Sequence, residues 1–239
     1  MKRILSTCLV LLVMGYMGGC SASQQVSETK IQIKGQTKSA LSPVYVPLAD
    51  YLTERFALED QSGIGIDLGS GRGDLIIELA KRSPRMHWIN ADINTKVFAG
   101  FFNKAASAGV SERVSAQLAD AKSLPYRSNY ADIIVSRGSF PFWGGVEAGL
   151  NEVNRVLKPG CSAYIGRGFS ENLPVDIARS IRQRQKQNRH WPNYDVDQTA
   201  TELADIMKRM GNKNYTIHRP KPAGSQGVNY GIWLEWRKE

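Results

Sequence analysis

The chain has 239 residues, a formal net charge of +9 and three cysteines. This length can bury the core of one domain and little more, and so few cysteines exclude a fold built on disulfides. The basic residues are spread along the chain without a base-stacking motif, which disfavours nucleic acid as a partner, whereas an anionic membrane surface or small molecule fits the charge.

The chain begins like an export signal. Met1-Lys2-Arg3 is followed by a mostly apolar run from Ile4 to Gly19, too short for a comfortable transmembrane span. The end of the run, Gly18-Gly19-Cys20, resembles a bacterial lipobox, although Met17 stands where leucine is usual. This resemblance implies a signal peptide over residues 1–19, lipid on Cys20 and an extracytoplasmic, membrane-anchored protein. An uncleaved signal anchor is the alternative, and the protein would be cytoplasmic if the signal is not used.

A polar segment over residues 20–39 predicts a flexible tether, and the domain is expected over residues 40–239. Pro43 and Pro47 flank a short apolar stretch, after which Leu48 to Leu58 can form an amphipathic helix. Cys161 is then the only cysteine of the domain, and we interpret it as a buried strand residue.

A glycine-rich turn follows. The apolar run from Gly63 to Leu68 predicts a strand, and Leu75 to Arg82 predicts a helix with Ile76, Leu79 and Ala80 on one face. Glycines between the two let the backbone turn and let a ligand approach closely. A dinucleotide fingerprint needs a third glycine where Asp74 stands, so the spacing disfavours a nicotinamide enzyme.

The second predicted strand, Met86–Asp92, ends in an acid. In an open α/β sheet the carboxyl end of this strand lies beside the first loop, where the Asp92 carboxylate can accept both ribose hydroxyls of an adenosyl ligand. Asp92 can also cap the turn that follows it, and the two roles are compatible. A helix is expected from Val97 to Ala105, with an apolar stripe that includes Phe102, and Gly109 ends it.

The remaining elements continue the alternation of strands and helices. Strands are predicted over 114–118, 131–136 and 161–166, with a helix over 146–157. The loop Arg137–Gly145 connects the second of these strands to that helix. After them we expect a basic helix over 174–188, a loop with His190, a helix over 199–210, and strands over 215–218 and 228–236.

Four motifs together resemble class I S-adenosylmethionine (SAM)-dependent methyltransferases of the small-molecule type. Asp67-x-Gly69-x-Gly71-x-Gly73 resembles their first motif, while Asp120-Ala121 and residues 130–136 resemble their adenine-side and fourth-strand motifs. Residues 152–160 resemble their post-core helix motif, with Cys161 in place of its final glycine. The resemblance covers about residues 60–168 and implies a Rossmann-like α/β fold: a seven-stranded, mostly parallel sheet with helices on both faces and an antiparallel C-terminal edge strand.

The resemblance also implies the site. SAM is the expected cofactor, a small molecule the expected substrate, and no metal is expected. Tyr45 and Tyr51, in the segment that covers the cofactor cleft in such enzymes, are candidate lid residues or core aromatics. The loop after the fourth strand is expected to line the acceptor pocket through Arg137 and Trp143. The cofactor is expected to contact Asp67, Gly69, Ser70, Gly71, Gly73, Asp92, Ile93, Asp120, Ala121 and Ser136.

The expected reaction is an in-line displacement on an already activated sulfonium, which requires alignment and exclusion of water rather than a catalytic triad. Among the histidines, His87 and His218 lie on predicted strands, so His190 is the candidate general base, with Arg137 as a second catalytic candidate. The alternative is a lipoprotein that binds SAM or another adenosyl ligand without turnover, because free SAM is a cytoplasmic metabolite.

Overall fold

The computed structural model describes residues 42–187 and 195–239. The predicted signal peptide, the lipidation site Cys20, the tether and His190 lie outside the described residues. The elements are α1 (Ser42–Arg55), β1 (Gly63–Leu68), α2 (Asp74–Arg82), β2 (Met86–Asp92), η1 (Thr95–Val97), α3 (Phe98–Ser107), η2 (Ser111–Arg113), β3 (Val114–Leu118), β4 (Ala131–Arg137), η3 (Phe140–Phe142), α4 (Val146–Val156), β5 (Leu157–Gly168), α5 (Val175–Gln187), α6 (Val196–Arg209), β6 (Tyr215–His218) and β7 (Gly231–Arg237).

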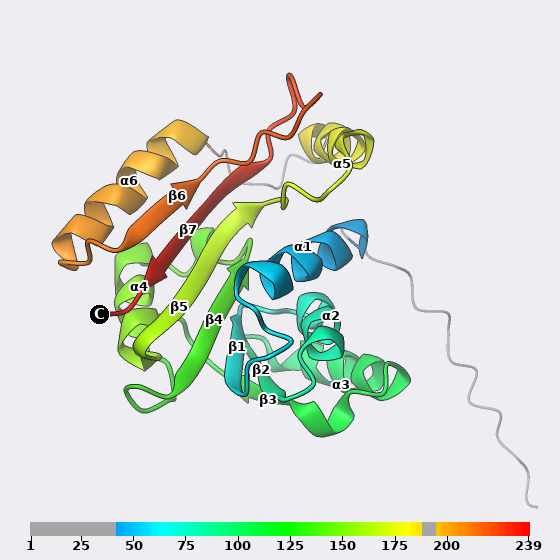
Figure 1. The fold of residues 1–239 in the computed structure, drawn as a ribbon, viewed down its shortest axis with the longest axis vertical. Coiled ribbons are helices and arrows are strands. Elements are labelled where there is room, and N and C mark those ends of the chain that lie inside the picture. Colours follow the sequence, from blue (N-terminus) through cyan, green and yellow to red (C-terminus); the bar gives the residue numbers. More distant parts are fainter. Residues whose placement is uncertain (1–41, 188–194) are drawn as a thin grey trace, which may run out of the picture. The chain divides into compact units, whose positions relative to one another are not determined.

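The strands form one seven-stranded sheet in the order β3-β2-β1-β4-β5-β7-β6 (Figure 1). The neighbouring pairs from β3 to β5 are parallel, and β7 is antiparallel to both β5 and β6. This arrangement confirms the predicted Rossmann-like fold with its mostly parallel sheet and antiparallel C-terminal strand. The last strand is inserted between β5 and β6, so the short β6 forms the edge.

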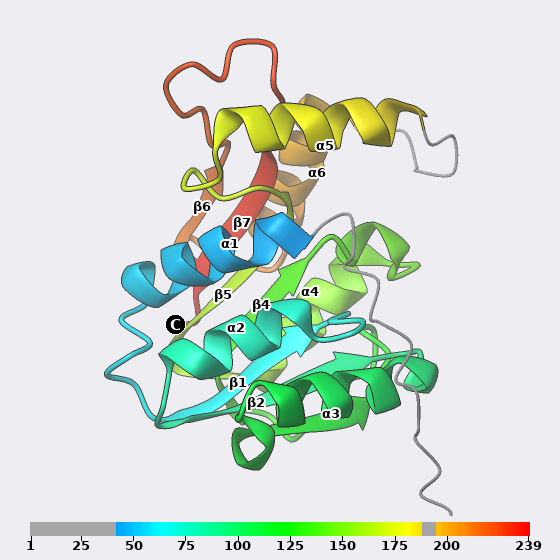
Figure 2. The same ribbon diagram turned by 90° about the vertical axis from the view of Figure 1, so that its right-hand side faces the viewer.

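Helices cover both faces of the sheet (Figure 2). Helices α1, α2 and α3 bury their apolar residues in one cluster, and α4 and α6 do so in the cluster on the opposite face. Side chains of β1 alternate between the faces: Ile66 and Leu68 belong to the cluster under α4 and α6. Gly65 faces the other way, where a Cβ would lie 2.5 Å from the ring of Trp88, so its missing side chain makes room for that indole.

An aromatic stack connects distant parts of the chain on the first face. The ring of Tyr164 in β5 lies 4.8 Å from that of Trp233 in β7 and 5.9 Å from that of Tyr51 in α1. Tyr51 is therefore a packing residue, in agreement with the core interpretation of this side chain. Helix α5 packs separately on a small cluster that contains Val44, Phe169 and Tyr230.

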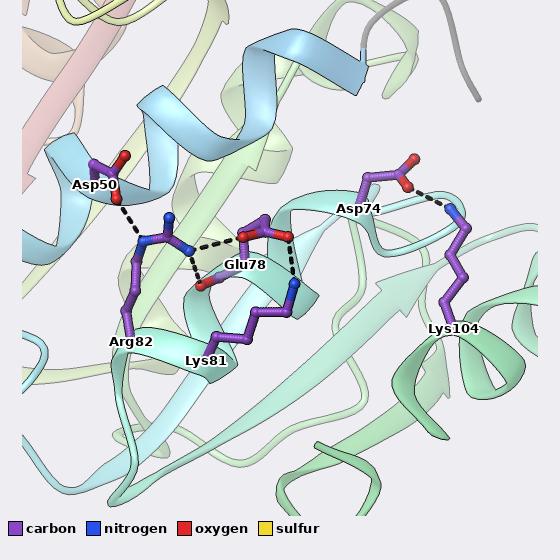
Figure 3. Close-up of polar contacts among 6 residues, drawn as sticks. All are labelled: Asp50, Asp74, Glu78, Lys81, Arg82 and Lys104. Atoms are coloured by element: carbon purple, nitrogen blue, oxygen red, sulfur yellow. Dashed lines mark hydrogen bonds and ion pairs between the residues drawn. The ribbon is translucent and has the colours of Figure 1, made fainter. Parts of the chain in front are cut away.

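Ion pairs on the surface tie α2 to both of its neighbours (Figure 3). Arg82 bonds Asp50 of α1 at 2.6 Å and Glu78 of its own helix at 2.8 Å. Asp74, the first residue of α2, pairs with Lys104 of α3. These ion pairs are partly exposed to solvent, and pairs at a protein surface typically contribute about 1 kcal/mol or less each. They fix the orientation of the helices, while the apolar clusters supply most of the stability.

Several predicted boundaries were wrong. Helix α1 begins at Ser42 rather than Leu48, because Pro43 sits in the first turn, where its missing N–H costs nothing, and Val44 is buried beside α5. Helix α6 begins three residues before Thr199, since Asp195 caps it by accepting from the N–H groups of Asp197 and Gln198.

Other predictions needed smaller corrections. Strand β5 begins at Leu157, which pairs with Ala131, so it includes the Lys-Pro-Gly stretch expected to precede it. The final strand begins at Gly231 rather than 228. Phe102 is 45 % exposed and lies outside the buried face of α3, and Cys161 is half-buried rather than buried. Among the described residues, no helix combines the length and apolar character needed to cross a membrane.

Candidate active site

The glycine loop connects β1 to α2 in left-handed backbone conformations, with φ values of 70° at Gly69, 56° at Gly71 and 70° at Gly73. The three positions differ in what surrounds them. A Cβ on Gly69 would lie 2.2 Å from Ser139, and one on Gly73 would lie 2.2 Å from the ring of Phe101. A Cβ on Gly71 would meet nothing within 4 Å. Gly71 therefore borders open space, whereas its two neighbours are glycine because protein packs against them.

The larger of two adjoining cavities has a volume of about 440 Å³ and opens at the carboxyl ends of the parallel strands. Most of the predicted site residues meet there although they come from separate loops. The lining residues are Leu68, Gly69, Asp92, Ile93, Ala119, Asp120, Ala121, Lys122, Arg137, Gly138, Ser139, Phe142, Trp143 and Gly144. The structure thus brings together residues that the sequence separates by more than one element.

The smaller cavity, of about 210 Å³, lies beside the glycine loop. Gly69 and Arg137 line both cavities, so the two adjoin at these residues. Its other lining residues are Tyr45, Asp67, Ser70, Gly71, Arg72, Asp74 and Leu75. Tyr45, a lid candidate, does reach the cavity. Arg72 and Asp74 were not predicted, although their position within and directly after the glycine motif could have indicated them.

Asp92 fixes the glycine loop. One carboxylate oxygen accepts the backbone N–H of Gly71 at 2.7 Å, and the other accepts that of Asn94 at 2.8 Å. The side-chain amide of Asn90 donates to the Gly71 carbonyl at 3.0 Å. The residue that caps η1 is Asn94, whose side chain accepts the N–H of Lys96, so the predicted capping role of Asp92 was wrong. Asp92 instead joins the glycine loop to the turn after β2, and each carboxylate oxygen keeps acceptor capacity toward the cavity that it lines.

Asp67 is almost fully buried at the end of β1, with 2 % of its surface exposed. Burial raises the pKa of its carboxyl to about 7, and the nearby charge of Asp92 acts in the same direction. The Ser70 hydroxyl and the charge of Arg137 oppose this rise. Burial destabilises the ionised form of the Asp67 carboxyl, and a cationic group bound in the smaller cavity would stabilise that form.

Part of the lining of the larger cavity is apolar. Ile93, which is 68 % exposed, and the buried Ala121 both belong to it. Asp120 accepts the backbone N–H of Lys122 at 2.9 Å. Single exposed apolar side chains are common, but Ile93 is exposed within a cavity lining, where an apolar part of a ligand could cover it.

The hydroxyl of Ser139 connects the loop after β4 to the end of β1. Ser139 donates to the Leu68 carbonyl at 2.8 Å, receives the indole N–H of Trp143 at 3.0 Å and lies 2.5 Å from the hydroxyl of Ser136. Ser136 lines neither cavity and stands behind Ser139. Trp143 does line the larger cavity, but it is mostly buried against Gly149 of α4.

Arg137 occupies the junction of the two cavities. Its Nε donates to the carbonyl of Gly168 at 3.2 Å, and its guanidinium lies 5.3 Å from the ring centroid of Tyr45 in α1. Burial lowers the pKa of Arg137 and raises the pKa of the Tyr45 hydroxyl. Among the described residues, no group of three or more His, Cys, Asp or Glu is placed to hold a metal ion.

Comparisons with known proteins agree with this geometry. Residues 66–160 match the family model described as a methyltransferase domain. A Methanococcus maripaludis protein assigned as an S-adenosyl-L-methionine-dependent methyltransferase has a similar structure, with a TM-score of 0.69, 28 % identity, and coverage of 84 % of this chain and 87 % of that one.

Two curated relatives match over shorter stretches. The chain is 36 % identical to the uncharacterized protein YafE of Escherichia coli over 38 % of this chain and 44 % of that protein. It is 33 % identical to demethylmenaquinone methyltransferase of Thermus thermophilus over 44 % of this chain and 46 % of that enzyme. The matched region thus spans less than half the length of these relatives.

Proposed function

We propose that this chain is a SAM-dependent methyltransferase that acts on a small-molecule acceptor. The observation that carries the proposal is the convergence of the glycine loop, Asp67, Asp92 and Asp120 on two adjoining cavities, together called the cleft, at the carboxyl ends of β1, β2 and β3. Open space beside Gly71, rather than a packed side chain, faces the part of this cleft that a cofactor would fill.

The residues present fit the cofactor. Asp92 has acceptor capacity for ribose hydroxyls, and the exposed Ile93 with Ala121 offers an apolar surface for an adenine ring. Asp120 lines the same cavity, and in this proposal its carboxylate accepts from the exocyclic amine of that ring. In the smaller cavity, Asp67 and the backbone of Ser70 and Gly71 surround the space for the amino-acid end. Gly73 contributes indirectly, because its missing side chain lets Phe101 support the loop.

When bound, SAM supplies a methyl group on a sulfonium that is already a good leaving group. The protein therefore needs to align the acceptor with this methyl and to keep water away. Arg137, Phe142 and Trp143 form the wall beyond the glycine loop where an acceptor would stand. The described residues place no histidine in the cleft lining, and His190 stays a candidate general base outside them.

We further propose that the protein is a lipoprotein anchored through Cys20, with the domain on the extracytoplasmic side. The support is the sequence: a charged start, an apolar run and the small residues Gly18-Gly19 directly before the cysteine. Two or more lipid chains on the new amino-terminal cysteine would be enough for stable anchoring.

The function is tested by titrating the purified chain with SAM in a calorimeter and by following release of S-adenosylhomocysteine with a panel of small-molecule acceptors. We expect SAM binding, and Asp92→Ala is expected to weaken it by about 1.5–3 kcal/mol, the range for hydrogen bonds to charged groups. The matched control is Asp205→Ala, which removes an exposed carboxylate of α6 that pairs with Lys208 and lines neither cavity of the cleft. Binding without turnover on any acceptor would instead favour a non-catalytic SAM-binding protein, and absence of binding would refute both.

A further inference from the structure

Arg137 carries a charge that has no carboxylate partner among the residues 42–187 and 195–239. Within the part of the chain that the structure describes, this side chain takes part in no ion pair, and its contacts are the Gly168 carbonyl and Tyr45. By contrast, the similarly half-buried Arg82 and Arg155 bond glutamates at 2.8 Å and 2.7 Å. Arg137 is the arginine that faces both cavities, so the unpaired charge lies inside the cleft.

Asp67, the acid whose charge acts on Arg137, does not neutralise the guanidinium as an ion-pair partner would. Asp67 acts on Arg137 through its charge, but it is buried with its pKa raised to about 7, so near neutral pH much of its carboxyl is protonated. A guanidinium remains protonated at any physiological pH. Burying it unpaired destabilises the ligand-free protein, and an oxyanion that enters the cleft would offset that cost.

The position of Arg137 indicates whether the oxyanion it binds belongs to the cofactor or to the methyl acceptor. The smaller cavity has a second arginine, Arg72, exposed on the glycine loop, which can serve the carboxylate of the cofactor. The backbone N–H of Gly71 is already donated to Asp92 and is not needed for this. Arg137 also lines the larger cavity, as do Gly138 and Phe142 of the loop after β4. In the sheet, β4 lies on the other side of β1 from β2 and β3, so Arg137 is separated by the glycine loop from Ile93 and Asp120, which follow β2 and β3. This is the side left for the acceptor once an adenosyl group covers Ile93.

We infer that Arg137 binds a carboxylate, or a comparable oxyanion, on the methyl acceptor, and that the substrate is therefore an anionic small molecule. The inference rests on the proposed methyltransferase function and narrows its substrate class. Arg137 holds the acceptor through charge-assisted hydrogen bonds, with Tyr45 and the Gly168 carbonyl fixing the guanidinium plane. Its role is to bind and orient the acceptor, and no proton needs to leave it.

The test uses calorimetry on the full chain with two probes. The first is S-adenosylhomocysteine, which reports on the cofactor site. The second is benzoate, added with and without S-adenosylhomocysteine, with neutral benzamide as its matched control and inorganic phosphate as an alternative oxyanion. The variants are Arg137→Gln, Arg137→Lys and Arg127→Gln, the last removing an exposed arginine that lines neither cavity of the cleft.

We expect the wild type to bind benzoate or phosphate but not benzamide. Arg137→Gln should weaken the oxyanion roughly tenfold or more, Arg137→Lys less, and Arg127→Gln not at all. Binding of S-adenosylhomocysteine should change by less than about threefold in all of them, and equal melting temperatures would show that the variants fold.

Two results would overturn the inference. One is that neither oxyanion binds the wild type. The other is that Arg137→Gln loses S-adenosylhomocysteine as strongly as it loses the oxyanion, which would assign Arg137 to the cofactor's own carboxylate. If the wild type binds no S-adenosylhomocysteine at all, the proposed function fails, while the titrations without it still decide whether Arg137 binds an oxyanion.

Discussion

At the scale of single residues, the glycine loop shows that one motif contains two kinds of glycine. Gly69 and Gly73 are required by packing, because Ser139 and Phe101 occupy the space of their side chains. Gly71 has open space where its side chain would be, although its φ of 56° still favours glycine. The sequence pattern shows all three alike, and only the structure separates the position that a ligand needs from those that the fold needs.

Gly71→Ala should therefore abolish SAM binding while the protein still folds. The added methyl enters the space of the cofactor, and the left-handed backbone costs about 1 kcal/mol of stability. Gly109→Ala is the matched control, because Gly109 has φ of 70°, nothing within 4 Å of its Cβ, and lies after α3 away from the cleft. Calorimetry and thermal melting should give similar stability losses for both variants but lost affinity only for Gly71→Ala. Unchanged SAM affinity in that variant would contradict the assignment of the loop.

Asp67 links cofactor binding to pH. Its pKa is about 7 in the folded protein against an ordinary value of 3.8, so the folded state holds this proton more tightly than the unfolded state. As the pH rises from about 4 to about 7, ionisation of this carboxyl progressively lowers the free energy of unfolding. Above about pH 7 the carboxyl is ionised in both states, so it causes no further loss of stability. A cationic ligand prefers the ionised form, so SAM affinity should rise across the same upper range.

Asp67→Asn removes this titration at nearly constant volume. We expect the ligand-free variant to be more stable than the wild type at pH 8, by up to about 4 kcal/mol, and no more stable at pH 4. Its SAM affinity should be weaker and should no longer rise between pH 6 and pH 8. Urea unfolding and calorimetry at these pH values measure both effects. A wild-type stability that rises from pH 5 to pH 8, with the variant following it, would show that Asp67 does not titrate in this way.

At the scale of elements, Asp132 connects three strands at the end of the sheet opposite the cleft. One carboxylate oxygen accepts the N–H of Ile64 in β1 at 2.8 Å, and both oxygens accept from Lys158 of β5 at 2.8 Å. The Lys-Pro-Gly stretch of the predicted motif thus begins a strand instead of only ending a helix. Its lysine has a structural role, far from the residues proposed to bind the cofactor.

Asp132→Ala should lower the free energy of unfolding by about 1.5–3 kcal/mol, because it leaves the Ile64 N–H without its acceptor. Asp205→Ala, which breaks an exposed pair with Lys208 at 3.3 Å, should cost less than about 0.5 kcal/mol. Urea titrations of both variants give the difference directly. Equal losses would show that the contact of Asp132 with β1 and β5 contributes no more than a surface charge.

The strands and helices also show how much of the fold could be predicted from the sequence. Strands β1, β2 and β3 agree with their predicted bounds because each is an apolar or alternating run that ends at an acid or a turn residue. The meeting of Asp92 with the Gly71 amide followed from the parallel order of these strands. The start of α1 was missed because two prolines suggested an extended segment, and only the burial of Val44 and Leu48 reveals the helix.

Other parts of the site depend on side-chain direction. Ser136 and Arg137 are neighbours in the fourth-strand motif, but strand alternation points them to opposite faces, so Arg137 lines the cavities and Ser136 does not. The contact of Arg137 with Tyr45 joins residues that no local pattern relates. The unpaired charge in the cleft could therefore not be predicted from the sequence.

At the scale of the whole molecule, the amino-terminal sequence predicts the cellular location of the protein. Signal peptidase cleavage before Cys20 requires small residues upstream, which Gly18 and Gly19 provide. Cys20→Ser should leave an uncut precursor without lipid label, whereas the wild type should carry lipid on an amino-terminal cysteine. Mass spectrometry of membrane fractions from an expressing bacterium measures both. Finding an intact Met1 and an unmodified Cys20 in the wild type would return the domain to a signal-anchored or cytoplasmic protein.

The aromatic stack of Tyr51, Tyr164 and Trp233 bears on how such a protein can evolve. The stretch that matches the methyltransferase family, residues 66–160, contains none of the three rings. The segments before and after that stretch meet through them and complete the layer beneath α1, which also brings Tyr45 to the cleft. The matched stretch supplies every lining residue of the two cavities except Tyr45. Recombination between relatives that exchanged this stretch without its flanks would therefore keep most of the cleft but would lose the fit to Tyr45 and the packing on the three rings. Inheritance should keep the two flanks together even as each diverges.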